Sequence, residues 1–590
     1  DGTIYLRPKL KLADFPVRLT DRLHHWANAE PNRVFMAERA GSDWRRISYA
    51  QLFEATRRIA SALIARGLSA ERPIVILSGN SIDHALIALG ALYAGIPFCP
   101  VSPAYSLVSR DYGKLGYVIK LLTPGLVFVD DADKFADALR ANVAPEVEIA
   151  ASRGAVPGRE VTRLADLMAT PEDGRLDAIH AAVGPDTIAK FLLTSGSTGN
   201  PKAVINTQRM ICANQVMLRE TLAFLKDEPP VIVDWLPWNH TFGGNHNVGL
   251  TLYNGGSMYL DEGKPMPGGI EETVRNLREI SPTVYFNVPK GYESLLPYLR
   301  DDADLRSKFF HRLHAMFFSG AALSPFVWNS LDALAVQEKG YRVPMLTGLG
   351  ATETSPFFMS VRPDTSRSGH VGLPVSGNDA KLVPNNGKLE VRARGPNVTP
   401  GYWRQPELTA KAFDEEGFYC IGDAGVFVDP TDPLQGIIFA GRVVEDFKLT
   451  TGTFVHVGSL RTDAIAAATP VVHDALVAGQ DREFIGLLCW PNLHACRQLV
   501  GNADASYEDV IRHPAVIACL EKGLQAHNAS TTGSSMRIAR AMLMVEPPSI
   551  DGNELTDKGY INQRAGLERR AELVEKLYAE QPCGEVIVLC

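Results

Sequence analysis

Length, composition and charge exclude several classes of protein before any motif is considered. The chain has 590 residues, of which 45% are hydrophobic and 21% charged, so it is long enough for several domains and has the composition of a globular protein. The formal net charge of −8 gives no electrostatic reason to expect a nucleic-acid or anionic-membrane partner, so an anionic substrate must be met by local cations.

The N-terminal segment has no apolar signal core. The most apolar long window, residues 82–98, contains Asp83 and His84 and does not predict a membrane span. The eight cysteines include no CxxC pair, so their spacing fits neither a zinc site nor a disulfide scaffold. These features predict a cytoplasmic protein with reduced thiols and no membrane partner.

Short apolar runs that lead into helix-like segments predict an α/β fold. Strands are expected at residues 72–77, 125–130, 188–193, 231–236, 315–318 and 343–346, and helices over about 81–94 and after Asn206. Ligands of open α/β sheets lie at the carboxyl ends of the strands. The polar or glycine-containing loops after these runs are therefore the candidate sites.

From about Gly387 the pattern changes to short strands broken by Gly and Asp, which predicts a smaller β-rich region. A mixed segment follows and ends in a charged helix that we expect over residues 562–579. We place a domain boundary near residues 442–446, with a first domain of residues 1–442 and a second of residues 443–590.

The sequence TSGSTGNPK at residues 194–202 has the chemistry of a phosphate-binding loop. Its glycines allow close approach to a ligand, its hydroxyls and amides can donate to phosphate oxygens, and Lys202 adds a cation. The order differs from the GxxxxGK loop, and Pro201 before the lysine argues against a helix that opens there. A Ser/Gly-rich surface turn is the structural alternative. A serine amidase or esterase is the alternative activity, although no GxSxG element occurs.

This stretch resembles the phosphate signature of the adenylate-forming superfamily, which includes acyl-CoA synthetases, luciferases and the adenylation domains of peptide synthetases. Further elements resemble that superfamily in its own order: SGAA from Ser319, GLGATET from Gly348, YCIGD from Tyr419, GR ending at Arg442, and ELTDKG from Glu554. The resemblance implies a large N-terminal domain of doubly wound α/β subdomains plus a β-rich subdomain. It also implies a smaller, mobile α+β C-terminal domain.

The resemblance implies roles for individual residues. Thr352 would contact the α-phosphate, Glu353 would hold Mg²⁺ as the metal ligand, and Lys558 would be the catalytic lysine of adenylation. Asp423 would accept the ribose hydroxyls. The full set of nucleotide and CoA contacts that it implies is Thr194, Ser195, Gly196, Ser197, Thr198, Gly199, Lys202, Ser319, Gly320, Ala321, Ala322, Leu349, Asp423, Arg442 and Lys448.

Three positions depart from the superfamily pattern. Leu349 stands where an aromatic residue usually lies against adenine, and Val444 stands where a polar hinge residue is common. Gly559 follows Lys558, whereas the usual glycine precedes the lysine. These departures concern adenine packing, the hinge and the CoA contacts.

The sequence WLPWNHTFGGNH at residues 235–246 matches the acyl-acid region of these enzymes. His240 aligns with a catalytic aromatic position at the carboxylate end, Phe242 can stack on a ring, and His246 with its asparagine neighbours can hydrogen-bond a ring substituent. Helix capping by these polar residues is the alternative. Residues 235–248 contain no aspartate, which disfavours an amino-acid substrate. The implied substrate contacts are His240, Phe242, His246, Ala321, Gly348, Gly350 and Pro356.

Over its whole length the chain is most similar to bacterial feruloyl-CoA synthetases, through WLPWNHTFGGNHN, GLGATETSP, GRVVEDFKL and LTDKGYINQRA. This resemblance implies an AMP-forming aryl-acid CoA ligase that uses ATP, Mg²⁺ and coenzyme A on a hydroxycinnamate such as ferulate. The alternatives are another aryl or medium-chain acid, or delivery to a carrier protein, although no GxDSL-like carrier motif occurs. The resemblance also allows a homodimer.

Overall fold

The computed structural model describes residues 2–195, 200–266, 268–385, 387–443, 445–531, 533–555 and 561–589. The chain divides into two compact units. The first comprises Asp1–Val383, Val391–Ile421 and Phe427–Ile438, and the second comprises Pro384–Glu390, Gly422–Val426 and Phe439–Cys590.

A seven-stranded sheet in the order β10-β9-β5-β4-β6-β7-β8 organises the N-terminal part of the first unit. Its strands are β4 (Ile74–Leu77), β5 (Phe98–Pro100), β6 (Leu126–Asp131), β7 (Glu148–Arg153), β8 (Thr162–Arg163), β9 (Ile188–Ser195) and β10 (Pro201–Thr207). All neighbours are parallel except β10, which is antiparallel to β9.

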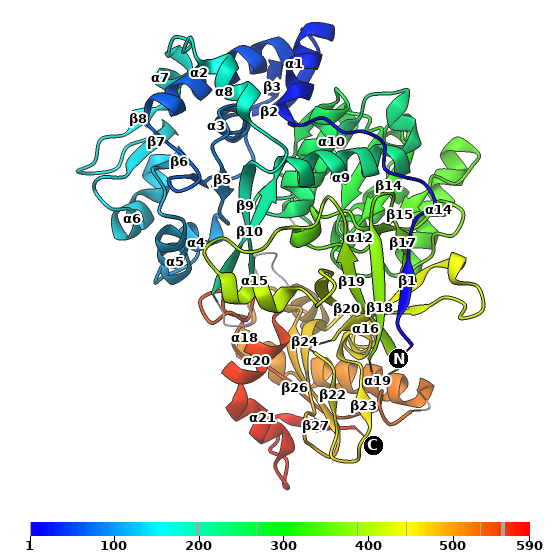
Figure 1. The fold of residues 1–590 in the computed structure, drawn as a ribbon. Coiled ribbons are helices and arrows are strands. Elements are labelled where there is room, and N and C mark those ends of the chain that lie inside the picture. The colour runs from blue at the N-terminus through cyan, green and yellow to red at the C-terminus, as the bar shows by residue number, and fades with distance from the viewer. Residues whose placement is uncertain are drawn as a thin grey trace. The chain divides into compact units, whose positions relative to one another are not determined.

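Both faces of this sheet are buried. Ile74 and Ile76 of β4 pack with α2 (Tyr49–Ala65) and α3 (Ile82–Tyr93), whereas Val75 and Leu77 pack in a second core with α5 (Gly113–Leu122) and α6 (Ala132–Asn142). Successive side chains of a strand point to opposite faces, so a run of apolar residues requires helices on both sides. Figure 1 shows these helices around β5, β6 and β7. The strand and helix expected near residues 72–94 are therefore confirmed.

Side-chain caps fix where the helices next to the site begin. Ser81 accepts a hydrogen bond from the backbone of His84 at the start of α3, and Thr207 accepts one from Met210 at the start of α9 (Gln208–Thr221). The helix expected after Asn206 is thus confirmed. The other helices of this unit are α1 (Thr20–Ala29), α4 (Ala104–Leu107), α7 (Leu164–Ala169), α8 (Leu176–Ala182), α10 (Val248–Tyr253), α11 (Ile270–Glu279), α12 (Pro289–Asp301), α13 (Ala303–Phe310), α14 (Pro325–Lys339) and α15 (Pro406–Ala412).

Two smaller sheets carry the other expected strands. One has the order β11-β12-β2-β3 and the other is the parallel sheet β13-β14-β15. Their strands are β2 (Val34–Ala40), β3 (Asp43–Ser48), β11 (Val231–Asp234), β12 (Ser257–Leu260), β13 (Val284–Asn287), β14 (Ala315–Phe318) and β15 (Met345–Leu346). The strand expected over residues 343–346 is shorter than predicted, because pairing with β14 involves only Met345 and Leu346.

The β-rich region is a seven-stranded sheet in the order β1-β18-β19-β20-β21-β17-β16. Its strands are β1 (Ile4–Leu6), β16 (Met359–Ser360), β17 (His370–Pro374), β18 (Asp379–Asn385), β19 (Lys388–Arg394), β20 (Tyr419–Phe427) and β21 (Ile437–Arg442). β1 is antiparallel to β18, so residues from the start of the chain complete a sheet formed near residue 380. This pairing is not visible in local sequence patterns.

The second unit contains the sheet β24-β25-β26-β27 with a helical layer on each face. Val477 and Leu487 pack against α16 and α19, and Leu476 and Leu488 pack with α20 and α21. The elements of this unit are β22 (Phe447–Lys448), β23 (Phe454–Val455), α16 (Val457–Ala467), β24 (Val472–Ala478), β25 (Ile485–Pro491), α17 (Leu493–Val500), α18 (Tyr507–Arg512), α19 (Pro514–Ser530), β26 (Ile538–Leu543), α20 (Gln563–Arg569), α21 (Ala571–Tyr578) and β27 (Val586–Val588).

The single helix expected over residues 562–579 is wrong, because α20 and α21 are separate. Arg570 between them has non-helical backbone angles. Its buried guanidinium donates to the buried carboxylate of Glu554, with Nε 2.6 Å from Oε1, and to the carbonyl of Pro547 at 3.1 Å. These polar contacts fix the chain direction at Arg570, and helical periodicity carries no signal for them.

Among the residues that the structure describes, no helix is long and apolar enough to cross a membrane. No disulfide joins any two of the seven described cysteines. Within the same ranges, no group of three or more His, Cys, Asp or Glu side chains is arranged to hold a metal ion.

Candidate active site

The two ends of the TSGSTGNPK stretch lie side by side. β9 ends at Ser195 and β10 begins at Pro201, and the antiparallel register pairs Thr194 with Lys202. The described ends of the stretch are therefore paired antiparallel strands, and Pro201 begins a strand and not a helix, as its position before Lys202 predicts. Gly196, Ser197, Thr198 and Gly199 lie outside the described residues, as does the side chain of Ser195.

A buried carboxylate lies next to these paired strands. Glu353 is in the short 3-10 helix η3 (Thr352–Thr354), and its Oε1 accepts a hydrogen bond from the Tyr402 hydroxyl at 2.9 Å. The Tyr419 hydroxyl lies 3.4 Å from that of Tyr402, and Lys202 Nζ lies 4.8 Å from the centre of the Tyr402 ring. Two phenols thus lie at the Glu353 carboxylate, and a lysine from a third segment lies over the ring of the nearer one.

Backbone contacts hold this arrangement together. The segment around Tyr402 runs along β10, where Trp403 N donates to Ala203 O at 2.8 Å, and Thr399 N donates to Glu353 O at 2.8 Å. Burial and the Glu353 carboxylate both raise the pKa of Tyr402 above its usual value, and they do the same for Tyr419. Both phenols therefore remain protonated donors at neutral pH.

The chemistry of Glu353 fits Mg²⁺. Since no cluster of three potential ligands occurs in the described part of the chain, an ion here would share one carboxylate with substrate phosphate oxygens and water. Mg²⁺ is commonly bound in this way, through one or two carboxylates and substrate phosphates. Thr352 is buried beside Glu353.

Close approach of neighbouring backbone explains the two glycines of the GLGATET sequence. A Cβ on Gly348 would lie 2.0 Å from Met359 O, and one on Gly350 would lie 1.7 Å from Pro356 O. Leu349 between them is buried and exchanges backbone hydrogen bonds of 3.2 and 2.9 Å with Met359. Gly348 and Gly350 are therefore required for close backbone packing around Leu349.

The adenine-side loop follows β14 directly. Ser319 is partly buried, and Gly320, Ala321 and Ala322 are exposed. Gly320 has φ of +96°, in the region that favours glycine. The backbone of this loop is thus accessible at the carboxyl end of a parallel strand, where ligands of α/β sheets bind.

The acyl-region segment folds tightly on itself after β11. A Cβ on Gly243 would lie 2.4 Å from Leu236 O, and one on Gly244 would lie 2.3 Å from Trp238 O. The chain then enters a π-helix, η2 (Phe242–Asn247), and His240 Nδ1 accepts from Phe242 N at 3.3 Å. Pi-helical turns are rare and often occur at functional sites.

Buried polar groups anchor η2 to the large sheet and to α9. Lys190 Nζ donates to Gly244 O at 3.1 Å, and Gln215 Nε2 donates to Asn245 O at 2.9 Å. Asn245 Nδ2 donates to Asn206 Oδ1 at 2.8 Å. Asn247, at the position before α10, makes no side-chain cap, so helix capping does not explain these polar residues.

His246 is enclosed by aromatic rings. Its ring centre lies 5.2 Å from that of Phe242, 5.0 Å from Phe286, 5.3 Å from Phe317 and 6.0 Å from Phe357. Phe286 and Phe317 lie on β13 and β14, so this cluster joins the acyl segment to the strand that precedes Ser319. Pro356, adjacent to Phe357, is partly buried.

In the second unit, Asp423 and Arg442 form an ion pair, with Nε and Oδ1 3.1 Å apart. The two residues are 19 positions apart in the sequence, and the pairing of β20 with β21 brings them together. Lys448 is exposed on β22. Lys558, Gly559 and Val444 lie outside the described residues.

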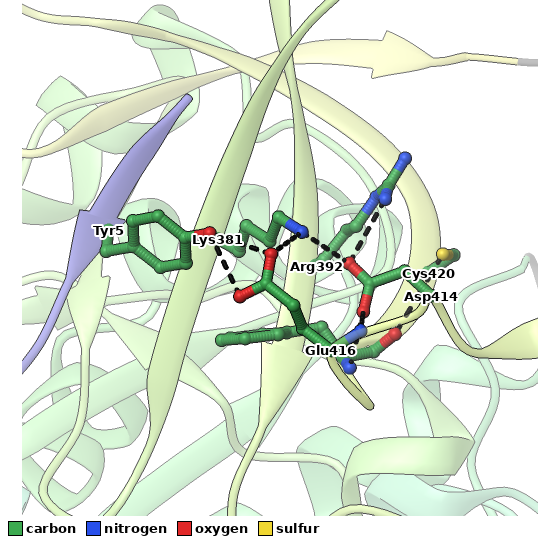
Figure 2. A network of polar contacts seen from close by, with 7 residues as sticks. Tyr5, Lys381, Arg392, Asp414, Glu416 and Cys420 are labelled. Atoms are coloured by element: carbon green, nitrogen blue, oxygen red, sulfur yellow. Dashed lines mark hydrogen bonds and ion pairs between the residues drawn. The ribbon is translucent and has the colours of Figure 1, made fainter. Parts of the chain in front are cut away.

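A polar network of the first unit positions the start of β20 (Figure 2). Lys381 Nζ contacts Asp414 at 2.9 Å and Glu416 at 2.5 Å, and the Tyr5 hydroxyl donates to Glu416 at 2.9 Å. Asp414 Oδ1 also accepts from Phe418 N at 2.9 Å, directly before Tyr419. The turn that leads into YCIGD is thus fixed by β18 and by the N-terminal strand.

Sequence reasoning missed Tyr402, Lys190 and Asn206. Tyr402 is 49 residues from Glu353, and no motif links the two. Lys190 is the one charged residue in the apolar run of residues 188–193, and this anomaly is the signal by which it could have been found. Asn206 lies at the end of a strand that had not been predicted.

Comparison with protein families identifies the two parts of the chain. The profile described as AMP-binding enzyme matches residues 23–403, and the profile described as AMP-binding enzyme C-terminal domain matches residues 455–582. A long-chain-fatty-acid–CoA ligase of Xenopus laevis is 22% identical over 659 residues, covering 97% of this chain and 85% of that protein. A 3-hydroxybenzoate–CoA/4-hydroxybenzoate–CoA ligase of Thauera aromatica is 25% identical over 449 residues, covering 73% and 79%.

Solved structures share the fold. ATP-bound MatB from Rhodopseudomonas palustris superposes with a TM-score of 0.69 at 22% identity, covering 94% of this chain and 99% of that one. The A domain of carboxylic acid reductase from Segniliparus rugosus, in complex with AMP and a co-purified carboxylic acid, gives a TM-score of 0.73 at 19% identity, covering 96% and 94%. The adenylate-forming fold, with a large N-terminal and a small C-terminal domain, is thereby confirmed.

Proposed function

The chain belongs to the AMP-binding enzyme family, and we propose that it is an aryl-acid CoA ligase that activates a hydroxycinnamate such as ferulate. The acid is converted with ATP to its acyl-adenylate, and the acyl group is then transferred to CoA. ATP, Mg²⁺ and CoA are the reactants and cofactor of adenylate-forming CoA ligases. Residues 1–442 form the adenylation domain in this proposal, and residues 443–590 form the mobile domain.

The gathering of Glu353, Tyr402, Tyr419 and Lys202 beside the TSGSTGNPK stretch carries the adenylation part of this proposal. Adenylation brings a carboxylate to the α-phosphorus of ATP, so two anions must approach. Cations and donors held in advance lower such a barrier. A surface turn would not need an oriented buried carboxylate at its base.

Each residue has its own role in the proposed reaction. Lys202, Thr194 and Thr352 bind phosphate oxygens, and Tyr402 holds the Glu353 carboxylate in place. Mg²⁺, held by Glu353, would neutralise charge on the phosphate oxygens when bound. The acid's carboxylate oxygen attacks the α-phosphorus and pyrophosphate leaves. Lys558 stabilises the charge on both reacting anions in this step. In the second half-reaction the CoA thiol attacks the acyl carbonyl and AMP leaves.

The nucleoside and CoA contacts in this proposal are the ones that the superfamily resemblance implies. Leu349 and the backbone of Ser319, Gly320, Ala321 and Ala322 contact adenine. Asp423 accepts hydrogen bonds from the ribose hydroxyl groups, and Arg442, which pairs with Asp423, contacts the ribose or a phosphate group. Lys448 contributes to the same nucleotide and CoA surface. The proposal includes a homodimer as the oligomeric state of the protein.

The aromatic enclosure of His246 supports an aryl acid. Aromatic rings prefer offset or edge-to-face neighbours, and Phe242, Phe286, Phe317 and Phe357 offer such partners around one polar group. The match to a hydroxybenzoate–CoA ligase agrees with this choice. The matches to long-chain-fatty-acid–CoA ligases favour a second candidate, a fatty acid.

Pyrophosphate release measured over aromatic, fatty and amino acids, first without and then with CoA, tests the proposal. We expect the highest kcat/KM with hydroxycinnamates, and an acyl-CoA product only when CoA is present. Faster turnover of long-chain fatty acids would replace the aryl acid by the second candidate. Turnover that is indifferent to CoA would point to a carrier protein as acceptor.

A further inference from the structure

His246 has one ring nitrogen engaged and one without a partner. The side chain is 1% exposed. Its Nδ1 lies 2.8 Å from Asn247 Oδ1, whereas Nε2 is buried and makes no hydrogen bond to any described group. Burial lowers the pKa of His246 to about 4, so the ring is neutral at physiological pH. Buried polar atoms normally have partners, so the lone Nε2 requires an explanation.

Asn247 determines which nitrogen carries the proton. Its Oδ1 only accepts hydrogen bonds, so Nδ1 must be the protonated nitrogen and Nε2 must be a bare acceptor.

None of the described residues donates a hydrogen bond to His246 Nε2. The four neighbouring rings belong to phenylalanines, and Asn245 is already committed to Asn206 and Thr241. Leaving a buried acceptor unpaired is costly. A ligand that brings a hydroxyl group to this point removes that cost, whereas a methoxy group or an alkyl chain does not.

We infer that His246 selects acids that carry a ring hydroxyl group, which donates its hydrogen bond to Nε2, and that Asn247 is a positioning residue that keeps Nε2 an acceptor. This inference rests on the proposed aryl-acid ligase function and narrows its substrates to hydroxylated aromatic acids. In ferulate the donor is the free phenol and not the methoxy group.

The wild-type protein provides the first test, with 3- and 4-hydroxycinnamate, the matching methoxycinnamates and cinnamate in a pyrophosphate-release assay. We expect one hydroxy acid to exceed its methoxy partner in kcat/KM by about 10- to 100-fold, the range for an unpaired buried group. If none of the acids releases pyrophosphate, the proposed function itself fails. If hydroxy and methoxy acids are used equally well, only the present inference fails.

Two variants separate selection from folding. H246F should bring the hydroxy-to-methoxy ratio close to one while cinnamate turnover persists. In N247L, Nε2 is free to carry the proton and to donate to a methoxy oxygen, so the ratio should shift toward the methoxy acid, which general loss of structure would not cause. F286L is the matched control, because it removes a ring and no polar atom. Its ratio should stay as in wild type, and an unchanged ratio in H246F would overturn the inference.

Discussion

Hydroxyl donors, and not a cation, orient the Glu353 carboxylate. The described residues include no ion pair to Glu353, whereas Tyr402 donates to it at 2.9 Å and Tyr419 lies behind Tyr402. Lys202 lies over the Tyr402 ring instead of on the carboxylate. A phenol fixes the position of the carboxylate without neutralising its charge, so that charge stays available for a metal ion.

Tyr402→Phe should therefore weaken the use of Mg²⁺ without destroying adenylation. The variant loses one hydrogen bond to a charged group, and we expect the Mg²⁺ concentration for half-maximal pyrophosphate release to rise about 10-fold. Tyr419→Phe serves as the control and should have a smaller effect, because its hydroxyl lies 3.4 Å from that of Tyr402. An unchanged Mg²⁺ dependence in Tyr402→Phe would show that Tyr402 does not orient the metal ligand.

Lys558→Ala should separate the two half-reactions. Lys558 is proposed to act when the carboxylate meets the α-phosphate, so its loss should abolish acyl-adenylate formation. Thioester formation from supplied acyl-AMP and CoA should remain. Lys576→Ala, at an exposed position of α21, should leave both activities intact. Equal loss of both activities in Lys558→Ala would contradict the role given to this lysine.

At the scale of elements, the π-helix η2 is held by groups that belong to other elements. Lys190 from β9 and Gln215 from α9 bind its carbonyls, and Asn206 from β10 binds the Asn245 side chain. Lys190 makes no ion pair within the described ranges, and burial lowers its pKa from 10.5 to about 7. A buried lysine without a carboxylate partner disfavours its own protonated form.

Lys190→Met should change how stability depends on pH. In the wild type, burial of the charged lysine lowers the free energy of unfolding, and this destabilisation is fully present below pH 7. It fades between pH 7 and 10.5, where the unfolded chain still binds the proton and the folded chain does not. Wild-type stability from this group therefore rises with pH. Urea unfolding from pH 6 to 10 should show Lys190→Met more stable than wild type at low pH, with the difference shrinking as pH rises.

The control for this experiment is Lys120→Met, at an exposed position of α5, which should retain the wild-type pH dependence. Parallel curves for wild type and Lys190→Met would show that Lys190 is charged in the folded protein across this range.

Local patterns predicted the elements whose causes are local. The buried runs of β4 and β6, and the helix begun by Thr207, follow from apolar periodicity and a capping residue. The turn at Arg570 and the pairing of β1 with β18 depend on residues far away in the chain, and no periodicity carries them. The π-helix was not predictable in this way either, although Gly243 and Gly244 marked a tight turn.

The same contrast holds for the site. Its motifs supplied the residues that touch ligands in the resembled enzymes. The residues that position these groups, such as Tyr402 and Lys381, lie in segments that match no motif. Orientation arises from contacts such as Tyr402 to Glu353, which span 49 residues.

At the scale of the whole molecule, the proposed machinery is divided between two units with separate cores. Glu353, Lys202 and His246 belong to the first unit, whereas Asp423, Arg442 and Lys448 belong to the second. Each unit has a sheet with buried side chains on both faces. Each unit therefore has the buried core that a separately folded domain requires.

Limited proteolysis should reveal this division. The Arg442 side chain is 52% exposed and Lys448 is exposed, and the two strands between Arg442 and α16, β22 and β23, have only two residues each. Exposed segments with little secondary structure are cut first, so trypsin should give early, persistent fragments that end at Arg442 or Lys448. Intact-mass spectrometry identifies the cut, and R442Q with K448Q is the control that should delay it. A first cut inside the sheet of β4 to β9 would contradict two separately folded units.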